Sequence, residues 1–103
     1  MKQRTVEFAP EARGDLFALY DWISVKASPV VAMGYIERIE TYCNEFDFAS
    51  ERGQMRNDIR SGLRIVGFEK RLTIAFIVSN TNVTILRIFY GGKNWEDEFD
   101  TRA

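Results

Sequence analysis

Arginine is the residue type in this sequence that is best suited to chemistry. Arg64 and Arg87 both fall in stretches whose apolar residues predict β-strands. A guanidinium donates two parallel hydrogen bonds to a phosphate or a carboxylate, so arginines held in strands can bind an acidic group. The alternative is structural, because either arginine can pair with a carboxylate such as Asp58 or pack its aliphatic stem beside the core. The sequence allows both interpretations.

The residue types that are missing exclude several kinds of catalysis. The chain has no histidine and a single cysteine, Cys43. Zinc sites of the usual kind, Ser-His-Asp triads and Cys-His dyads are therefore excluded, and we expect neither a metal nor a cofactor. Because one cysteine cannot form an internal disulfide, and because no signal peptide or membrane span is evident, we expect a cytoplasmic protein.

Charge is distributed unevenly along the chain. Residues 1–51 carry five basic and nine acidic side chains (net −4), residues 52–93 carry eight and two (net +6), and residues 94–103 carry one and four (net −3). This split predicts a positive surface suited to an acidic peptide or a nucleic acid, although ordinary surface scatter in a small protein would look the same. The candidate contact residues on such a surface are Arg56, Arg60, Arg64, Arg87 and Lys93.

The arginines that precede the strands are predicted to lie in a loop. Arginine recurs every four residues from Arg52 to Arg64, which would form one basic ridge on a helix. Gly53 and the pair Ser61-Gly62 make such a helix unfavourable, so we interpret residues 50–61 as a basic loop. Its structural alternative is a solvated loop without a partner.

Two helices are predicted to form a hairpin that supports the strands. Pro10 begins the first helix, and Ser28-Pro29 begins the second with Ser28 as its N-cap. Because the connection between them is short, the helices should lie antiparallel. Apolar residues recur at helical spacing in both, at Ala12, Leu16, Leu19, Tyr20 and Ile23 in the first and at Ala32, Ile36, Ile39, Cys43 and Phe46 in the second.

The remaining pattern predicts a single α+β domain over residues 1–103. Four strands are predicted, at Thr5–Phe8, Gly62–Phe68, Leu72–Val78 and Asn82–Tyr90, and a short final helix is predicted to begin at Asn94. The order is β-α-α-β-β-β-α, with the helical hairpin packed on a mainly antiparallel, four-stranded sheet. The two-residue period places Arg87 on one face of its strand with Val83, Ile85 and Phe89, and Tyr90 on the other face.

These elements, in this order, resemble the ParE/RelE toxin superfamily of type II toxin–antitoxin systems. Four segments carry the resemblance, namely VEFAPEA and DL at residues 6–12 and 15–16, DIRSGLR at 58–64, VTILRIFYGG at 83–92 and NWE at 94–96. The match spans residues 5–99, and the segment at residues 48–53 departs from it by lacking a proline before Gly53.

The resemblance implies a toxin that a cognate, ParD-like antitoxin neutralises, in a module that stabilises a plasmid or chromosome. ParE-type members inhibit DNA gyrase, whereas RelE-type members are enzymes that cut mRNA on the ribosome. In a RelE-like nuclease, Arg64, Arg87 and Tyr90 would be the catalytic candidates. The acidic total charge and the missing histidine favour the gyrase inhibitor, which would not be an enzyme. A non-toxic interaction domain on the same fold is a further alternative.

Aromatic residues outside the main apolar stripes are candidates for contact with the antitoxin. They are Phe17, Trp22, Trp95 and Phe99. The structural alternative is that Trp22 completes the core of the hairpin, and that Trp95 and Phe99 attach the final helix to the sheet. For Trp95 and Phe99 we favour the structural role, and for Tyr90 a place at the edge of the core.

Overall fold

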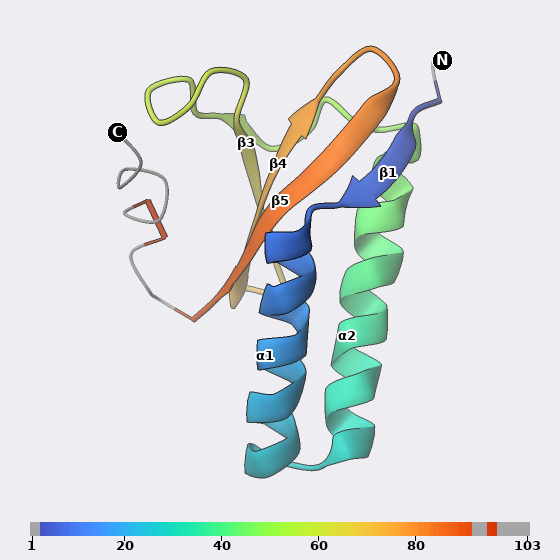
Figure 1. Ribbon diagram of the computed structural model, residues 1–103, viewed down its shortest axis with the longest axis vertical. Coiled ribbons are helices and arrows are strands. Elements are labelled where there is room, and N and C mark those ends of the chain that lie inside the picture. Colours follow the sequence, from blue (N-terminus) through green and yellow to red (C-terminus); the bar gives the residue numbers. More distant parts are fainter. Residues whose placement is uncertain (1–2, 92–94, 97–103) are drawn as a thin grey trace.

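The fold consists of two helices packed on a twisted sheet, seen here in a computed structural model that describes residues 3–91 and 95–96 (Figure 1). The elements in chain order are β1 (Thr5–Phe8), α1 (Pro10–Lys26), α2 (Pro29–Asn44), the 3-10 helix η1 (Glu45–Asp47), β2 (Gln54–Met55), β3 (Arg64–Phe68), β4 (Leu72–Val78) and β5 (Asn82–Tyr90). The predicted α+β fold class is confirmed. Within the described residues, neither helix is long and apolar enough to cross a membrane. The predicted final helix begins at Asn94 and lies almost wholly outside the described residues, with Trp95 and Glu96 in a turn.

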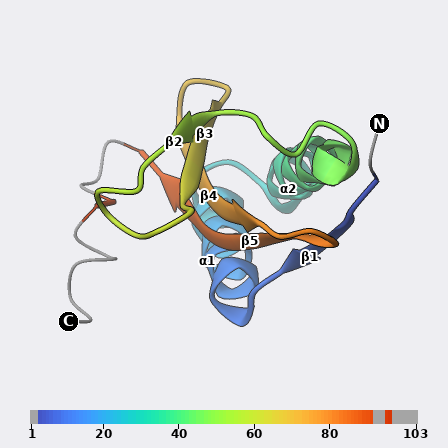
Figure 2. The same ribbon diagram turned by 90° about the horizontal axis from the view of Figure 1, so that it is seen from above.

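The sheet has five strands in the order β1-β5-β4-β3-β2 (Figure 2). β3, β4 and β5 form an antiparallel meander, and β1 pairs in parallel with β5. The predicted number of four strands was wrong, because the two-residue strand β2 lies inside the segment that was interpreted as a loop. Two residues are too few to show an alternating pattern, so the sequence gives no periodic signal for this strand.

Gly53 allows the chain to enter β2. Its φ of +75° lies in the left-handed region, and a Cβ atom placed there would lie 2.2 Å from the carbonyl oxygen of Ile65 on β3. Only glycine lets the two backbones approach this closely. Gln54 and Met55 then pair with Ile65 and Arg64.

The helical hairpin forms as predicted and supplies one side of the main core. Ser28 caps α2 by accepting a hydrogen bond from the Val31 amide at 3.2 Å. Nine of the ten predicted stripe residues are buried, and Tyr20 packs at the edge of the core. Cys43 is one of the buried residues, and its burial raises the pKa of its thiol to about 12. This cysteine is therefore an unreactive core residue.

A β-bulge in β5 changes which residues share a face. Ile85 pairs with Phe76 and Arg87 pairs with Ala75, so Leu86 is the extra residue in β5. The predicted common face was therefore wrong in part. Val83 and Ile85 face the helices, whereas Arg87 is in register with Ala75 on the opposite face and lies beside Phe89.

The β3–β4 turn has two residues in a left-handed conformation that neither residue favours. The φ angles of Glu69 and Lys70 are 52° and 64°. Glu69 is held from α2 by Arg38, which donates two hydrogen bonds of 3.0 Å to its carboxylate. This ion pair lowers the pKa of Glu69 and ties the turn to the helical layer.

We expect Lys70→Gly to raise the free energy of unfolding by about 1 kcal/mol, because glycine lacks the Cβ atom that makes the left-handed conformation costly. Urea denaturation monitored by circular dichroism measures the change. Lys70→Ala is the matched control and should bring no gain, since alanine keeps the Cβ atom. Equal midpoints for wild type and Lys70→Gly would contradict this account of the turn.

Candidate functional site

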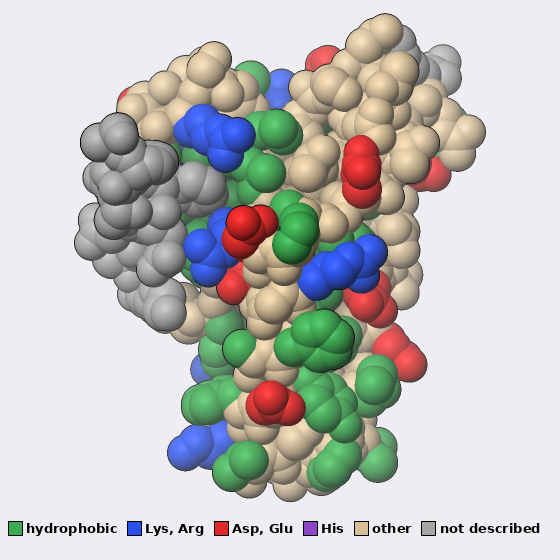
Figure 3. All heavy atoms as spheres, viewed as in Figure 1, with side chains coloured by type: hydrophobic (Ala, Val, Ile, Leu, Met, Phe, Trp, Pro, Cys, Tyr) green, Lys and Arg blue, Asp and Glu red, His purple; other side chains and the backbone are tan. Residues whose placement is uncertain are grey.

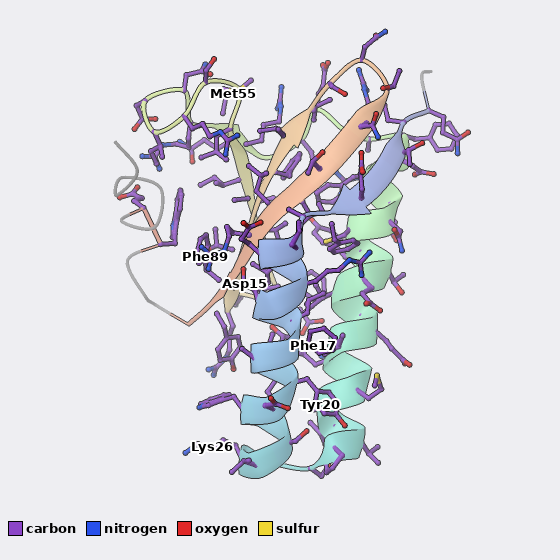
Figure 4. The ribbon with its side chains drawn as sticks, viewed as in Figure 1. Asp15, Phe17, Tyr20, Lys26, Met55 and Phe89 are labelled. Atoms are coloured by element: carbon purple, nitrogen blue, oxygen red, sulfur yellow. The ribbon has the colours of Figure 1, made fainter. Side chains whose placement is uncertain are left out.

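An ion pair joins α1 to the edge of β5 at the predicted site residue Arg87. β1 ends at Phe8, which pairs with Ile85, so the next part of the β5 edge has no neighbouring strand. Asp15 on α1 fills this place. Its carboxylate accepts hydrogen bonds from Arg87 Nε at 2.8 Å, from Arg87 Nη2 at 3.0 Å and from the backbone N–H of Ile88 at 2.8 Å. Figure 4 shows Asp15 on the first turns of α1, close to β5.

The guanidinium of Arg87 is thus engaged by the protein itself. Both side chains of the pair are largely covered, with 25% of Arg87 and 18% of Asp15 exposed. The guanidinium also lies over the Phe89 ring, 4.9 Å from its centre. This bidentate geometry is the one that would bind a phosphate, but a carboxylate of the same chain occupies it.

A groove next to this ion pair brings together Trp22 and Tyr90. It has a volume of about 430 Å³ and lies between α1 and the end of β5. Trp22 is half exposed, and its ring centre lies 5.4 Å from that of Tyr90 and 5.8 Å from Lys26 Nζ. Tyr90 packs against the main core, as predicted, and contacts Tyr35 edge to face at 6.3 Å.

Arg56 is the centre of a second set of contacts, on the face of the sheet that the helices leave uncovered. It forms an ion pair with Asp58 at 2.8 Å and another with Glu96 at 2.9 Å. The two carboxylates raise the pKa of Arg56, and Arg56 lowers the pKa of Asp58. Its guanidinium also lies 5.6 Å from the centre of the Trp95 ring.

The other predicted contact residues are scattered. Arg64 lies in β3 opposite Phe76 and donates a hydrogen bond of 3.2 Å to the carbonyl oxygen of Arg52. Arg60 is exposed in the loop before β3, and Lys93 lies outside the described residues. The register therefore places Arg64 and Arg87 on opposite faces of the sheet, and the arginines do not gather into one cluster.

An apolar groove on the outside of the helical hairpin is the feature that sequence reasoning largely missed. Its volume is about 500 Å³, and its lining is Leu16, Phe17, Tyr20, Met33 and Ile36, with Arg13, Asp21 and Glu40 at the rim. Phe17 is 73% exposed, and only this residue was singled out beforehand. Tyr20 and Met33 gave no separate signal, because Tyr20 continues the core stripe and Met33 stands outside the apolar stripe of the second helix.

Most of the large apolar side chains that are exposed in the described residues lie on the hairpin. Figure 3 shows hydrophobic side chains concentrated over the hairpin, in contrast to the mixed surface above it. In Figure 4, Phe17 and Tyr20 project from α1 towards α2. An exposed apolar region of this kind makes the hairpin a candidate surface for binding another molecule.

Two solved structures with this fold come from toxin–antitoxin systems. One is the chromosomal ParDE system from P. aeruginosa, at 23% identity and a TM-score of 0.76, covering 86% of this chain and 97% of that one. Another is the toxin–antitoxin complex RelBE2 from Mycobacterium tuberculosis, at 18% identity and a TM-score of 0.56, covering 90% and 97%. A search of the curated proteins gave no match.

The family is shown by the sequence itself. The model of the ParE toxin of the type II toxin–antitoxin system parDE matches residues 6–95. The chain therefore belongs to the ParE toxin family, as the resemblance implied.

Proposed function

We propose that this chain is a growth-inhibiting toxin that acts in the cytoplasm on DNA gyrase and is neutralised by a cognate, ParD-like antitoxin. The observation that carries the proposal is the match to the ParE toxin family across residues 6–95. The likeness to a ParDE system supports an antitoxin as the partner.

The arginine contacts support inhibition by binding in preference to cleavage of RNA. A nuclease that stabilises a phosphate in the transition state needs guanidinium groups aimed at one point. Here Arg87 donates to Asp15, Arg64 donates to a backbone carbonyl, and the two lie on opposite faces of the sheet. Tyr90 packs against the core that faces the helices, whereas Arg87 faces the other way.

We expect the purified toxin to inhibit supercoiling by DNA gyrase and to leave ribosome-bound mRNA intact. Gel assays of plasmid supercoiling and of mRNA cleavage on programmed ribosomes measure the two activities side by side. Adding the antitoxin encoded beside the toxin should restore supercoiling, which shows that inhibition comes from the toxin itself.

The reverse pair of results would overturn the gyrase assignment. Cleavage of mRNA with normal supercoiling would make Arg64, Arg87 and Tyr90 candidate catalytic residues of a RelE-like nuclease. Expression that leaves growth unchanged would support a third function, a non-toxic interaction domain on the same fold.

The apolar groove of the helical hairpin is the best-supported binding site for the antitoxin. It joins an exposed aromatic residue, Phe17, to the exposed Met33 across the two helices. An amphipathic segment binds such a groove by placing apolar side chains at successive turns. The partner's acidic groups would then reach the exposed basic residues of the region 52–93, such as Arg60.

A further inference from the structure

The face of the sheet that points away from the helices is apolar and needs a cover. We call this the outer face. Three of its residues, Leu63, Ala75 and Phe89, are buried, and three further apolar residues pack against them, namely Ile59, Ile65 and Leu86. In a protein of two layers, the outer face of the sheet normally meets solvent and carries polar residues. An apolar outer face therefore marks a surface that another group covers.

Trp95 supplies part of this cover. Its ring stacks on Phe89 with the ring centres 6.1 Å apart and the planes inclined by 27°. The Arg56 guanidinium lies 5.6 Å from the centre of the same ring. Trp95 thus contacts both an apolar ring and a cation, an arrangement that suits any aromatic side chain.

Glu96, the residue after Trp95, is held by the same arginine. Its carboxylate pairs with Arg56 Nη1 at 2.9 Å. Arg56 is itself well anchored, since its Nε and Nη2 donate to Asp58 at 2.9 and 2.8 Å and its backbone N–H donates to Leu63 at 2.7 Å. One anchored arginine therefore contacts two successive residues, through the aromatic ring of Trp95 and the carboxylate of Glu96. We call Trp95 and Glu96 the latch.

The contacts of the latch are of a kind that can exchange. The Arg56–Glu96 pair is partly open to solvent, with 45% of the Glu96 side chain exposed. Exposed ion pairs of this kind are weak, because water and salt compete with them. An outside segment that offers the same two groups can therefore compete with the latch.

We propose that the outer face is a peptide-binding surface that the latch occupies in the free protein, and that a partner segment with a large apolar residue followed by a carboxylate binds there by displacing it. Arg56 would give this surface its preference for an aromatic ring followed by a carboxylate, because it contacts both groups in the latch. The inference goes beyond the proposed function, because it concerns a different surface from the helical groove and holds for any target of the toxin.

The direct test uses a peptide that copies the latch. The probe is a fluorescein-labelled peptide with the sequence of residues 94–98, NWEDE, and its binding to the full chain is followed by fluorescence anisotropy. The variant Trp95→Ala/Glu96→Ala, with its latch removed, should bind the peptide roughly tenfold more tightly than wild type. Adding Arg56→Gln to that variant should reverse the gain.

Two controls make the outcome specific. Trp22→Ala removes the other tryptophan, which lies in the groove beside Tyr90, and should leave the affinity for the peptide at the wild-type level. A peptide with Ala and Gln in place of its Trp and Glu should not bind. The proposal is overturned if the variant without a latch binds no more tightly than wild type, or if the substituted peptide binds equally well.

A second measurement does not depend on removing Trp95. In a Trp22→Phe background Trp95 is the remaining tryptophan, and acrylamide quenching of its fluorescence reports its exposure to solvent. Glu96→Gln should increase the quenching constant about twofold, because the pair with Arg56 is lost. Unchanged quenching would show that Glu96 does not hold the ring in place and would contradict the latch.

Discussion

Asp15→Ala should lower the free energy of unfolding by about 3 kcal/mol, the largest loss of stability that we expect from a single polar residue in this chain. Three donors lose their acceptor together, two on Arg87 and the backbone N–H of Ile88. Only 25% of the Arg87 side chain is exposed, so water replaces the lost acceptor poorly. Urea denaturation of both proteins measures the difference.

Two further variants separate the contributions to this loss. Asp15→Asn keeps a carbonyl oxygen for the Ile88 N–H and should lose less stability than Asp15→Ala. Asp21→Ala is the matched control, because it removes an exposed carboxylate from the same helix and should change stability by less than about 0.5 kcal/mol. Similar losses for Asp15→Ala and Asp21→Ala would mean that the ion pair does not hold α1 against β5.

The features of the fold that were predicted correctly have long, regular patterns. The two apolar stripes of the hairpin repeat over several turns, and the proline at the start of each helix fixes the boundary. The three long strands have five, seven and nine residues. In these segments local propensity and tertiary burial agree, so the periodicity alone was sufficient.

The features that were missed depend on single residues or on contacts far apart in the sequence. The strand β2 has two residues, and its position depends on the close approach of Gly53 to Ile65. The bulge at Leu86 reverses the face on which the following residues lie, and no pattern in the strand marks it. A period-two rule carries such an error to every residue after the bulge.

The candidate site was harder to predict than the fold for the same reason. A net charge of +6 over residues 52–93 suggested one basic surface, but charge counted along the chain says nothing of where each carboxylate lies. Asp15 is 72 residues away from Arg87 in sequence and neutralises it in the fold. Glu96 likewise reaches Arg56 from the other end of the chain.

The reassignment of these arginines changes which one should be used to test electrostatic steering. Arg64 and Arg87 were candidate contact residues from the sequence, yet each serves as a hydrogen-bond donor within the fold. Arg60 is exposed and makes no ion pair within the described part of the chain. Arg60→Glu should therefore slow association with an acidic partner without disturbing the fold.

Phe17→Asp should weaken binding of the cognate antitoxin about 100-fold, which is the largest effect on affinity that we expect. This expectation rests on the proposed antitoxin-binding site in the groove of the hairpin. Phe17 is 73% exposed, so the change removes little that the free toxin needs for stability. In the complex the new carboxylate would be buried among Leu16, Tyr20 and Met33, at a rim where Arg13 faces two carboxylates, Asp21 and Glu40. Burial of the new charge and repulsion from the net negative rim then act together.

Surface plasmon resonance at several salt concentrations measures this loss and separates it from steering. Phe17→Asp should act mainly through a faster dissociation rate, because an apolar anchor holds the complex after it forms. Arg60→Glu should instead reduce the association rate, and only at low salt. Val25→Asp is the matched control, since Val25 is 84% exposed on the same helix and lies outside the lining of the groove. If Phe17→Asp and Val25→Asp bind the antitoxin equally well, the antitoxin does not sit in the groove of the hairpin, and the apolar surface there must serve the toxin's target instead.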